Sequence, residues 1–187
     1  MVQELLKEAG ISLAQCDAIA FGSGPGSFTG VRTACGVAQG LAFGQDLRVV
    51  PVVTLLAMAQ ACREDCHADD VLVILDARMG EVYWAQYRFA DGWQTVLPPR
   101  LTAPSAVTAN GEVVACGNGL AAYPDEFANL TARAMHPQVM PQAARVATLA
   151  CVAFEAGDTV AARDAQPLYV RDKVALTTEE RLARAAS

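Results

Sequence analysis

The residues best suited to chemistry stand in a glycine-rich loop near the start of the chain. Residues 22–27 read GSGPGS and lie between an apolar run at 18–21 and a stretch rich in small residues at 28–43. A loop that joins a strand to a helix can present backbone N–H groups to an anion, because the first helical turn has unpaired donors and the positive end of the dipole. The candidate anion or nucleotide loop therefore consists of Gly24, Pro25, Gly26 and Ser27.

This loop departs from both standard phosphate-binding motifs. A P-loop requires a lysine after its last glycine, and none follows here. The dinucleotide pattern GxGxxG would need a glycine where Ser27 or Thr29 stands. A tight turn that binds no ligand is the other interpretation, and the residues leave both open. Ser27 or Thr29 is expected to cap the following helix.

Serine, cysteine and histidine residues form weaker patterns. A serine nucleophile needs a general base and an orienting acid, but His67 and His136 lie far along the chain from the serines of the loop. Cys62, Cys66 and His67 suggest a metal site, yet no second pair of ligands accompanies them. We therefore predict no catalytic residue and no metal site in this chain.

An acidic residue follows a continuous apolar run at 71–75. Asp76 stands two positions before Arg78, at the predicted end of a buried strand. In α/β proteins ligand-binding groups gather at such strand ends. An ion pair that holds a hairpin turn is the alternative, and we favour it.

Hydrophobic periodicity predicts the elements that position these groups. Strands and helices alternate, which indicates an α/β protein. A polar linker at 65–70 divides the chain into a first lobe, 1–66, and a second lobe, 67–187. Thr54 is expected to cap the third helix. Strands are predicted at 18–21, 49–53, 71–75, 81–89, 93–101 and 111–119, and helices at 1–9, 28–43, 55–64 and 140–156.

Regularly spaced glycines lie within the helix predicted at 28–43 and directly after it. Gly36, Gly40 and Gly44 recur at every fourth position. A glycine inside a helix costs about 1 kcal/mol relative to alanine. Three glycines along one edge of the helix therefore suggest that another element packs very close to that edge. We expect a strand or helix of the same chain to pack there, and a partner helix is compatible with it.

Composition limits the partners of the chain. The net charge is −6, the pI about 4.8, and 53% of the residues are hydrophobic. Phosphate binding depends on lysine and arginine, so we expect contact with RNA only through a partner protein. No apolar run reaches a membrane span of about 18 residues, and no basic start followed by an apolar h-region marks a signal peptide. Six scattered cysteines favour a reducing, cytoplasmic compartment.

Two motifs carry a resemblance to a known family. GSGPGSFTGVR, preceded by CDAIAFG, and LDARMGEVYWAQY at 75–87 resemble the TsaB (YeaZ) family of tRNA-modification proteins. The resemblance implies an α/β, two-lobed fold of the actin, Hsp70 and sugar-kinase (ASKHA) superfamily. Members of the family begin with a pair of strands before the helix that matches residues 1–9, so we expect an incomplete N-terminal lobe.

The resemblance also implies a function. TsaB helps TsaD attach threonylcarbamoyl to the adenosine next to the anticodon, and TsaE, an ATPase, joins the cycle. The chain would be a non-catalytic scaffold and activator in a threonylcarbamoyltransferase complex, with no cofactor of its own and ATP or ADP at the level of the complex. It would pair with TsaD, or with itself as a dimer, through two helices. The implied interface residues are Val2, Leu5, Leu6, Ala34, Val37, Ala38 and Leu41.

Two other classes of protein stay open. One is an ASKHA-type nucleotide-binding phosphotransferase or ATPase, which needs a catalytic aspartate and a complete first sheet. The other is a glycoprotease-like peptidase, a label that older names give to this group. The related TsaD family holds a metal with an HxxxH pattern, and no two histidines lie that close here.

Overall fold

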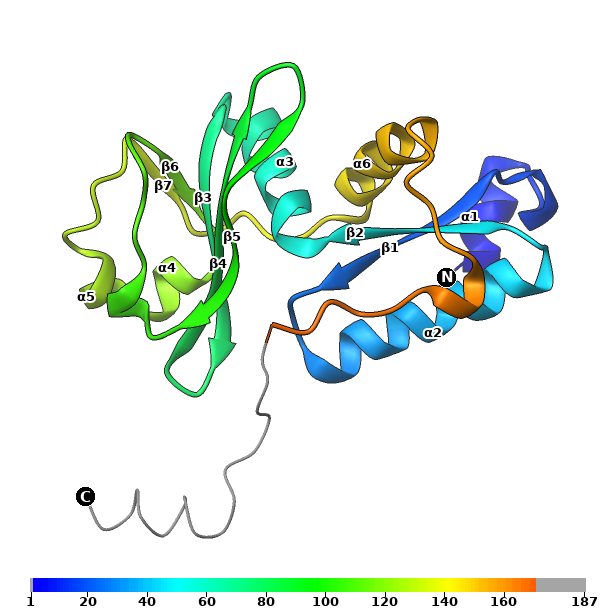
Figure 1. Cartoon of the computed structure of the whole chain (residues 1–187), viewed down its shortest axis with the longest axis horizontal. Coiled ribbons are helices and arrows are strands. Elements are labelled where there is room, and N and C mark those ends of the chain that lie inside the picture. The colour runs from blue at the N-terminus through cyan, green and yellow to red at the C-terminus, as the bar shows by residue number, and fades with distance from the viewer. Residues whose placement is uncertain (1, 171–187) are drawn as a thin grey trace, which may run out of the picture.

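The first sheet consists of two parallel strands joined by a helix. The structure, a computed structural model, describes residues 2–170. In it β1 (Ala18–Gly24) pairs with β2 (Arg48–Val53), and α2 (Phe28–Gly44) connects the two strands (Figure 1). Parallel neighbours require such a crossover, because the chain must return to the same end of the sheet. The predicted strands and helix of this region are confirmed.

Side chains of these strands alternate between two covered faces. Val49 belongs to a cluster that contains Ala38 of α2, whereas Val50 shares a cluster with Ala150 of α6 (Ala143–Glu155). The two helices therefore cover opposite faces of the sheet. Parallel strands are stable where both faces are buried, and this sheet meets that condition.

A five-stranded sheet forms the other half of the molecule. The strand order is β5-β4-β3-β6-β7. β3, β4 and β5 form an antiparallel meander, while β6 runs parallel to β3 and β7 runs parallel to β6. The bounds are β3 (Asp70–Arg78), β4 (Glu81–Phe89), β5 (Trp93–Thr102), β6 (Val114–Cys116) and β7 (Ala134–His136).

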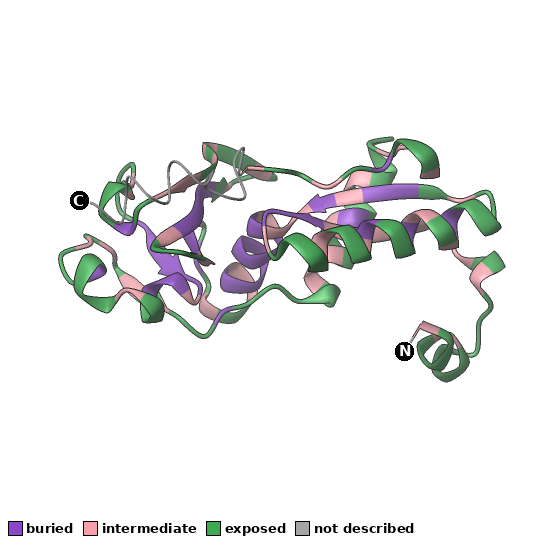
Figure 2. Cartoon of the chain, turned by 90° about the horizontal axis from the view of Figure 1, so that it is seen from below, coloured by how far each residue is buried: buried purple, intermediate pink, exposed green. Residues whose placement is uncertain are grey.

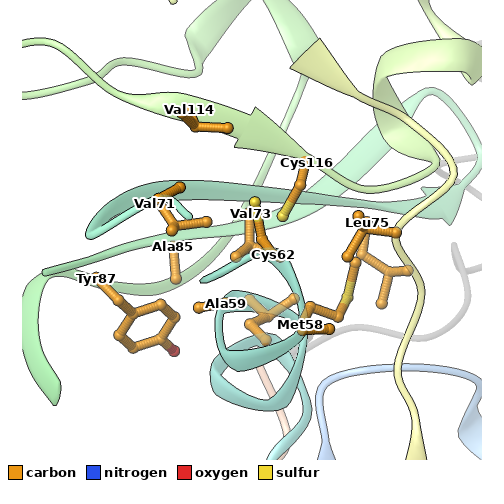
Figure 3. Packing of buried hydrophobic residues seen from close by; sticks show 14 of the residues in the cluster. Met58, Ala59, Cys62, Val71, Val73, Leu75, Ala85, Tyr87, Val114 and Cys116 are labelled. Atoms are coloured by element: carbon orange, nitrogen blue, oxygen red, sulfur yellow. The ribbon is translucent and has the colours of Figure 1, made fainter. Parts of the chain in front are cut away.

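The core of the second half lies on both sides of β3. Residues 71–75 are all buried, as their continuous apolar character predicts. The helix α3 (Thr54–Cys66) covers one face, and Figure 3 shows its side chains packed beneath those of the sheet. Two short helices, α4 (Gly119–Ala122) and α5 (Pro124–Phe127), cover the other face.

The structure differs from the prediction mainly between residues 111 and 134. The strand expected over 111–119 is limited to β6, and α4, α5 and β7 have no counterpart among the predicted elements. Helices of one turn carry too little periodicity to be recognised in a sequence. Three-residue 3₁₀ helices complete the described chain: η1 (Leu13–Gln15), η2 (Pro104–Ala106) and η3 (Ala162–Asp164).

The layers around each sheet are not contiguous in the sequence. The division expected at residue 66 separates the strands of the two sheets. However, α3 packs on the second sheet, while α6 and the residues after it lie against the first. Figure 1 shows this return of the chain in orange.

The helix α1 (Val2–Ala9) projects from the end of the molecule (Figure 2). None of its residues is buried. Within residues 2–170, no helix combines the length and the apolar character that a membrane span requires.

Candidate functional site

Hydrogen bonds within the chain fix the glycine loop. Ser23 Oγ donates to the carbonyl oxygen of Val52 at 3.1 Å, and the backbone N–H of Gly24 donates to Thr54 Oγ1 at 3.0 Å. Gly24 has a φ of +114°, and a Cβ there would lie 2.8 Å from the carbonyl oxygen of Leu168. Both constraints call for glycine. The loop is therefore a rigid part of the fold.

The two residues expected to cap helices behave differently. Ser27 caps α2, since its Oγ accepts from the backbone N–H of Gly30 at 3.4 Å. Thr54 does not cap α3: the N-cap is Val53, and no side chain caps that helix. The hydroxyl of Thr54 accepts from Gly24 instead. It thus joins the start of α3 to the glycine loop.

A Thr54→Val variant is expected to lose about 1–2 kcal/mol of unfolding free energy, because the N–H of the buried Gly24 is left without its acceptor. Urea unfolding followed by circular dichroism measures this loss. Thr54→Ser keeps the acceptor and is the matched control, expected to lie within about 0.5 kcal/mol of wild type. Equal losses in both variants would contradict the assigned role of the hydrogen bond.

A segment near the end of the described chain crosses the glycine loop. We call residues 165–170 the C-terminal strap. The backbone N–H of Leu168 donates to the carbonyl oxygen of Ser23 at 2.7 Å. Arg32 Nε of α2 donates to the hydroxyl of Tyr169 at 2.7 Å. The strap therefore joins the end of β1 to the beginning of α2.

A cleft of about 800 Å³ lies between the two halves of the molecule. The glycine loop and the first turn of α2 form one wall, the turn between β3 and β4 forms the other, and the C-terminal strap borders both. Of the predicted loop residues, Pro25, Gly26 and Ser27 line the cleft, whereas Gly24 does not. A volume of this size is within the range of small-molecule sites.

Asp76 is the acidic group at the second wall. Its side chain is 7% exposed, and its oxygens accept from the backbone N–H of Arg78 at 2.8 Å and the guanidinium of Arg78 at 3.2 Å. The hydroxyl of Tyr123 also donates to it, at 3.2 Å. Burial, followed by the charge of Asp76, raises the pKa of Tyr123. The predicted ion pair that holds the hairpin turn is confirmed.

The turn that Asp76 holds has an uncommon backbone. Arg78 and Met79 both have left-handed φ angles, 63° and 59°, which cost energy for residues with a side chain. Asn118 Oδ1 accepts the backbone N–H of Asp76 at 3.0 Å and so fixes the turn to the loop after β6. These contacts offset the local strain.

Asp76→Ala is expected to destabilise the protein by about 2–3 kcal/mol, since it removes two hydrogen bonds and one ion pair of a buried carboxylate. Denaturant unfolding provides the measurement. Tyr123→Phe removes one of these bonds and should cost about 0.5–1.5 kcal/mol. An Asp76→Ala variant as stable as Tyr123→Phe would show that the carboxylate does not hold the turn.

Histidines and cysteines do not assemble at the cleft. Of residues 2–170, none that lines it is a histidine or a cysteine. His67 is exposed and follows α3 in a left-handed conformation. Within the described part of the chain, no group of three or more histidine, cysteine or acidic side chains could hold a metal ion.

A second candidate site is the outer face of α2. We call Gly36, Val37, Gly40, Phe43 and Gly44 the glycine face; all five are exposed. A Cβ added at any of the three glycines would meet nothing within 4 Å. The expectation that an element of the same chain packs on this edge is therefore wrong for the described residues. Val37 is 50% and Phe43 82% exposed.

The predicted interface residues divide between the two sides of α2. Val37 lies on the glycine face, while Ala34 and Leu41 are half-buried at its border. Ala38 is 3% exposed and packs into the cluster of the first sheet. Its inclusion among accessible interface residues is therefore corrected.

The interface residues predicted in α1 remain accessible. Leu5 is exposed, and Val2 and Leu6 are half-buried. These side chains share one face of an amphipathic helix. The structure therefore leaves them available for contact with another protein.

Sequence reasoning missed two parts of the cleft. Asn118 follows β6 in the motif GNG. This motif predicts a turn at that position, but it does not predict the hydrogen bond between Asn118 and the backbone of Asp76. The C-terminal strap carries no recognisable motif, because its contacts with Ser23 and Arg32 join residues far apart in sequence.

A family model, individual relatives and solved structures agree on which proteins this chain is similar to. The sequence model of the family described as "TsaD: tRNA N6-adenosine threonylcarbamoyltransferase" matches residues 1–178. The "tRNA threonylcarbamoyladenosine biosynthesis protein TsaB" of Escherichia coli K12 is 41% identical over 184 residues, which cover 94% of this chain and 79% of that protein.

Two solved structures share the fold. "YeaZ from Pseudomonas aeruginosa" has a TM-score of 0.84 and 37% identity, over 90% of this chain and 81% of that one. A second Pseudomonas aeruginosa structure, described as similar to peptidase YEAZ, has a TM-score of 0.86 and 37% identity, over 91% of this chain and 81% of that one. The predicted ASKHA-like α/β fold is confirmed by this similarity.

Proposed function

The chain belongs to the TsaB (YeaZ) family, and we propose that it acts in tRNA threonylcarbamoyladenosine biosynthesis as a non-catalytic scaffold and activator of TsaD. Participation in this biosynthesis rests on relatives that match nearly the whole chain and carry that name. The division of labour with TsaD rests on the surface of α2.

The glycine face of α2 is the observation that carries the proposal. This 17-residue helix contains one charged residue, Arg32, although its outer side faces solvent. Solvent-facing helix surfaces are normally charged or polar. Glycines without a neighbour allow another backbone to approach closely, and an exposed Phe43 supplies an apolar anchor. The occupant that we propose is a helix of TsaD.

Homodimers are the expected alternative state when TsaD is absent. A surface that accepts a helix of a protein with the same fold can also accept its own copy, because an isologous interface uses one patch twice. The free side chains of α1, Val2, Leu5 and Leu6, would extend the contact. TsaE and tRNA then join through TsaD, in line with the net charge of −6.

The cleft supports a role without catalysis by this chain. Its lining includes Ser27 and Asp76 but no histidine, and both side chains have structural tasks as a helix cap and a turn anchor. A peptidase with a serine nucleophile would require a base within reach. The proposed role beside tRNA modification implies a cytoplasmic compartment, and all six cysteines are free thiols.

Nucleotide binding in the cleft is a second candidate function. The volume of about 800 Å³ and the position between two lobes favour it. Against tight binding, Arg78 is the one cation among the lining residues that the structure describes, and it is paired with Asp76, while the N–H of Gly24 is already bonded. We therefore expect ATP or ADP to bind at the level of the complex with TsaD.

The experiment that tests the proposal is a reconstitution of threonylcarbamoyl transfer to tRNA. We expect no product from this chain alone and a rate increase when it is added to TsaD and TsaE. Product formation by the chain without TsaD would contradict the non-catalytic role. Equilibrium dialysis against ATP, with and without TsaD, tests nucleotide binding, the second candidate function. Saturable binding of ATP to the isolated chain would favour that function.

A further inference from the structure

Arg32 is the one charged residue of α2, and two aromatic rings hold it in place. Its guanidinium carbon lies 3.7 Å from the centroid of the Phe28 ring and 5.4 Å from the centroid of the Tyr169 ring. Its Nε donates to the hydroxyl of Tyr169 at 2.7 Å. Phe28 lies one turn earlier on the same helix, whereas Tyr169 belongs to the C-terminal strap. An arginine fixed in this way loses little side-chain freedom when it binds a ligand.

These contacts leave part of the Arg32 guanidinium without a partner. A ring that stacks on the plane of a guanidinium leaves the edge of that plane open to hydrogen bonds. Within residues 2–170, neither Nη group of Arg32 has a hydrogen-bond acceptor, and no carboxylate pairs with it. The side chain is exposed to solvent. The ligand that fits such a free fork of donors is an oxyanion that accepts two parallel hydrogen bonds.

Arg32 lies at the N-terminal end of the glycine face. Residues four apart share one side of a helix, so Arg32 lies one turn before Gly36 and two turns before Gly40. Phe43, at the other end of the face, is about 16–17 Å from Arg32 along the helix axis, at a rise of 1.5 Å per residue. A helix that packs on the glycines would therefore pass the guanidinium at one end and the phenylalanine ring at the other.

We infer that Arg32 binds the carboxylate of an aspartate or glutamate on the helix that packs on the glycine face, and so sets the direction of that helix. The inference rests on the proposed function, in which that helix belongs to TsaD. The glycines and Phe43 supply only apolar contact, which does not distinguish the two directions of a helix. A charge at one end of the face does so, because the reverse direction would leave the guanidinium without a carboxylate.

Close packing on the glycines would also strengthen the pair. Where a partner helix excludes water, two opposite charges attract more strongly than they do in solvent. Removal of one member of such a pair leaves the other charge desolvated and without a partner. The loss of Arg32 should therefore weaken the complex more than the loss of an arginine elsewhere on the surface.

A phosphate of RNA has the same chemistry as a carboxylate, but the surroundings of Arg32 disfavour it. Binding of a nucleic-acid backbone depends on several lysines and arginines along its path. The glycine face that continues from Arg32 contains no charged residue. The net charge of the whole chain is −6. These features favour a single carboxylate on a protein helix.

The test measures affinity for TsaD from the same organism by calorimetric titration. Arg32→Gln should bind TsaD at least about tenfold more weakly than wild type. Arg32→Lys keeps the charge but lacks the planar fork, and its affinity should lie between the two. Arg100→Gln is the matched control, because Arg100 is an exposed arginine beside the Trp84 ring on the second sheet. That variant should bind TsaD as wild type does.

An exchange of charges separates direct binding from a structural role of Arg32 beside the strap. Arg32→Glu should bind TsaD more weakly than Arg32→Gln does, because two carboxylates then meet. In a set of TsaD variants that each change one helix aspartate or glutamate to arginine, one should restore the affinity for Arg32→Glu at least about tenfold. A set in which no variant restores this affinity would overturn the inference.

The outcomes also separate this inference from the proposed function. If wild type does not bind TsaD, the proposed function is wrong and the inference falls with it. If wild type and Arg32→Gln bind TsaD equally well, the inference alone is overturned. Direct binding of tRNA that Arg32→Gln loses, with an unchanged affinity for TsaD, would overturn it in favour of a phosphate ligand.

Discussion

Gly40→Leu is expected to make the isolated chain more stable and its complex with TsaD weaker. A leucine in place of a mid-helix glycine gains about 0.8–1 kcal/mol of helix propensity, and a Cβ at Gly40 meets nothing within 4 Å. At a close helix–helix contact the same side chain acts as overpacking, which costs about 1–3 kcal/mol. Calorimetric titration should therefore give an affinity for TsaD at least about tenfold below wild type.

Opposite signs in stability and affinity distinguish a binding surface from a structural one. Gly92→Leu lies in the turn between β4 and β5, where the added Cβ also meets nothing within 4 Å. That variant is the matched control and should bind TsaD as wild type does. If Gly40→Leu and Gly92→Leu bind equally well, the glycine face is not the docking surface.

Gly117→Ala is expected to destabilise the protein by about 3 kcal/mol or more. Its φ is +109°, and a Cβ there would overlap the carbonyl oxygen of Ile74 and approach Met58 Cε to 2.9 Å. The clash involves backbone of the central strand β3, which cannot move without breaking the sheet. Urea unfolding measures the loss.

Gly111→Ala is the matched comparison, because Gly111 also has a positive φ, +80°, but no atom near the position of a Cβ. That change should cost only about 1–2 kcal/mol, the penalty of a left-handed conformation. Similar losses of unfolding free energy for both glycines would show that the loop after β6 can move to accommodate a Cβ. That result would contradict a rigid cleft wall built by Asn118 and Asp76.

Local signals in the sequence predict much of the fold. Alternation and apolar runs mark β1 to β5, and the glycine loop with its cap at Ser27 lies where the motif places it. The Asp76–Arg78 pair is also local, since the two residues are two positions apart. Such features need only neighbouring residues, so periodicity and turn chemistry suffice.

The orientation of α2 shows what a sequence pattern leaves open. Ala34, Ala38 and Ala42 form one stripe and the three glycines form another, and both consist of small residues. Ala38 and Ala42 pack against the first sheet, which leaves the glycines outside. Because burial of a methyl group is favourable and glycine has none to bury, the alanine stripe is the better core face.

Contacts between distant segments are also beyond the sequence. The C-terminal strap lies on the glycine loop through Leu168 and Ser23, and α6 returns to the first sheet after the chain has completed the second. Neither arrangement leaves a local signal. The same holds for Cys62 and Cys116, which belong to one buried cluster because α3 packs on the second sheet.

The most direct test of the proposed role is size-exclusion chromatography with light scattering, applied to this chain, to TsaD from the same organism and to their mixture. The account predicts a one-to-one complex for wild type and two separate species for the Gly40→Leu mixture. Separate species for the wild-type mixture would contradict a scaffold that works through the glycine face of α2.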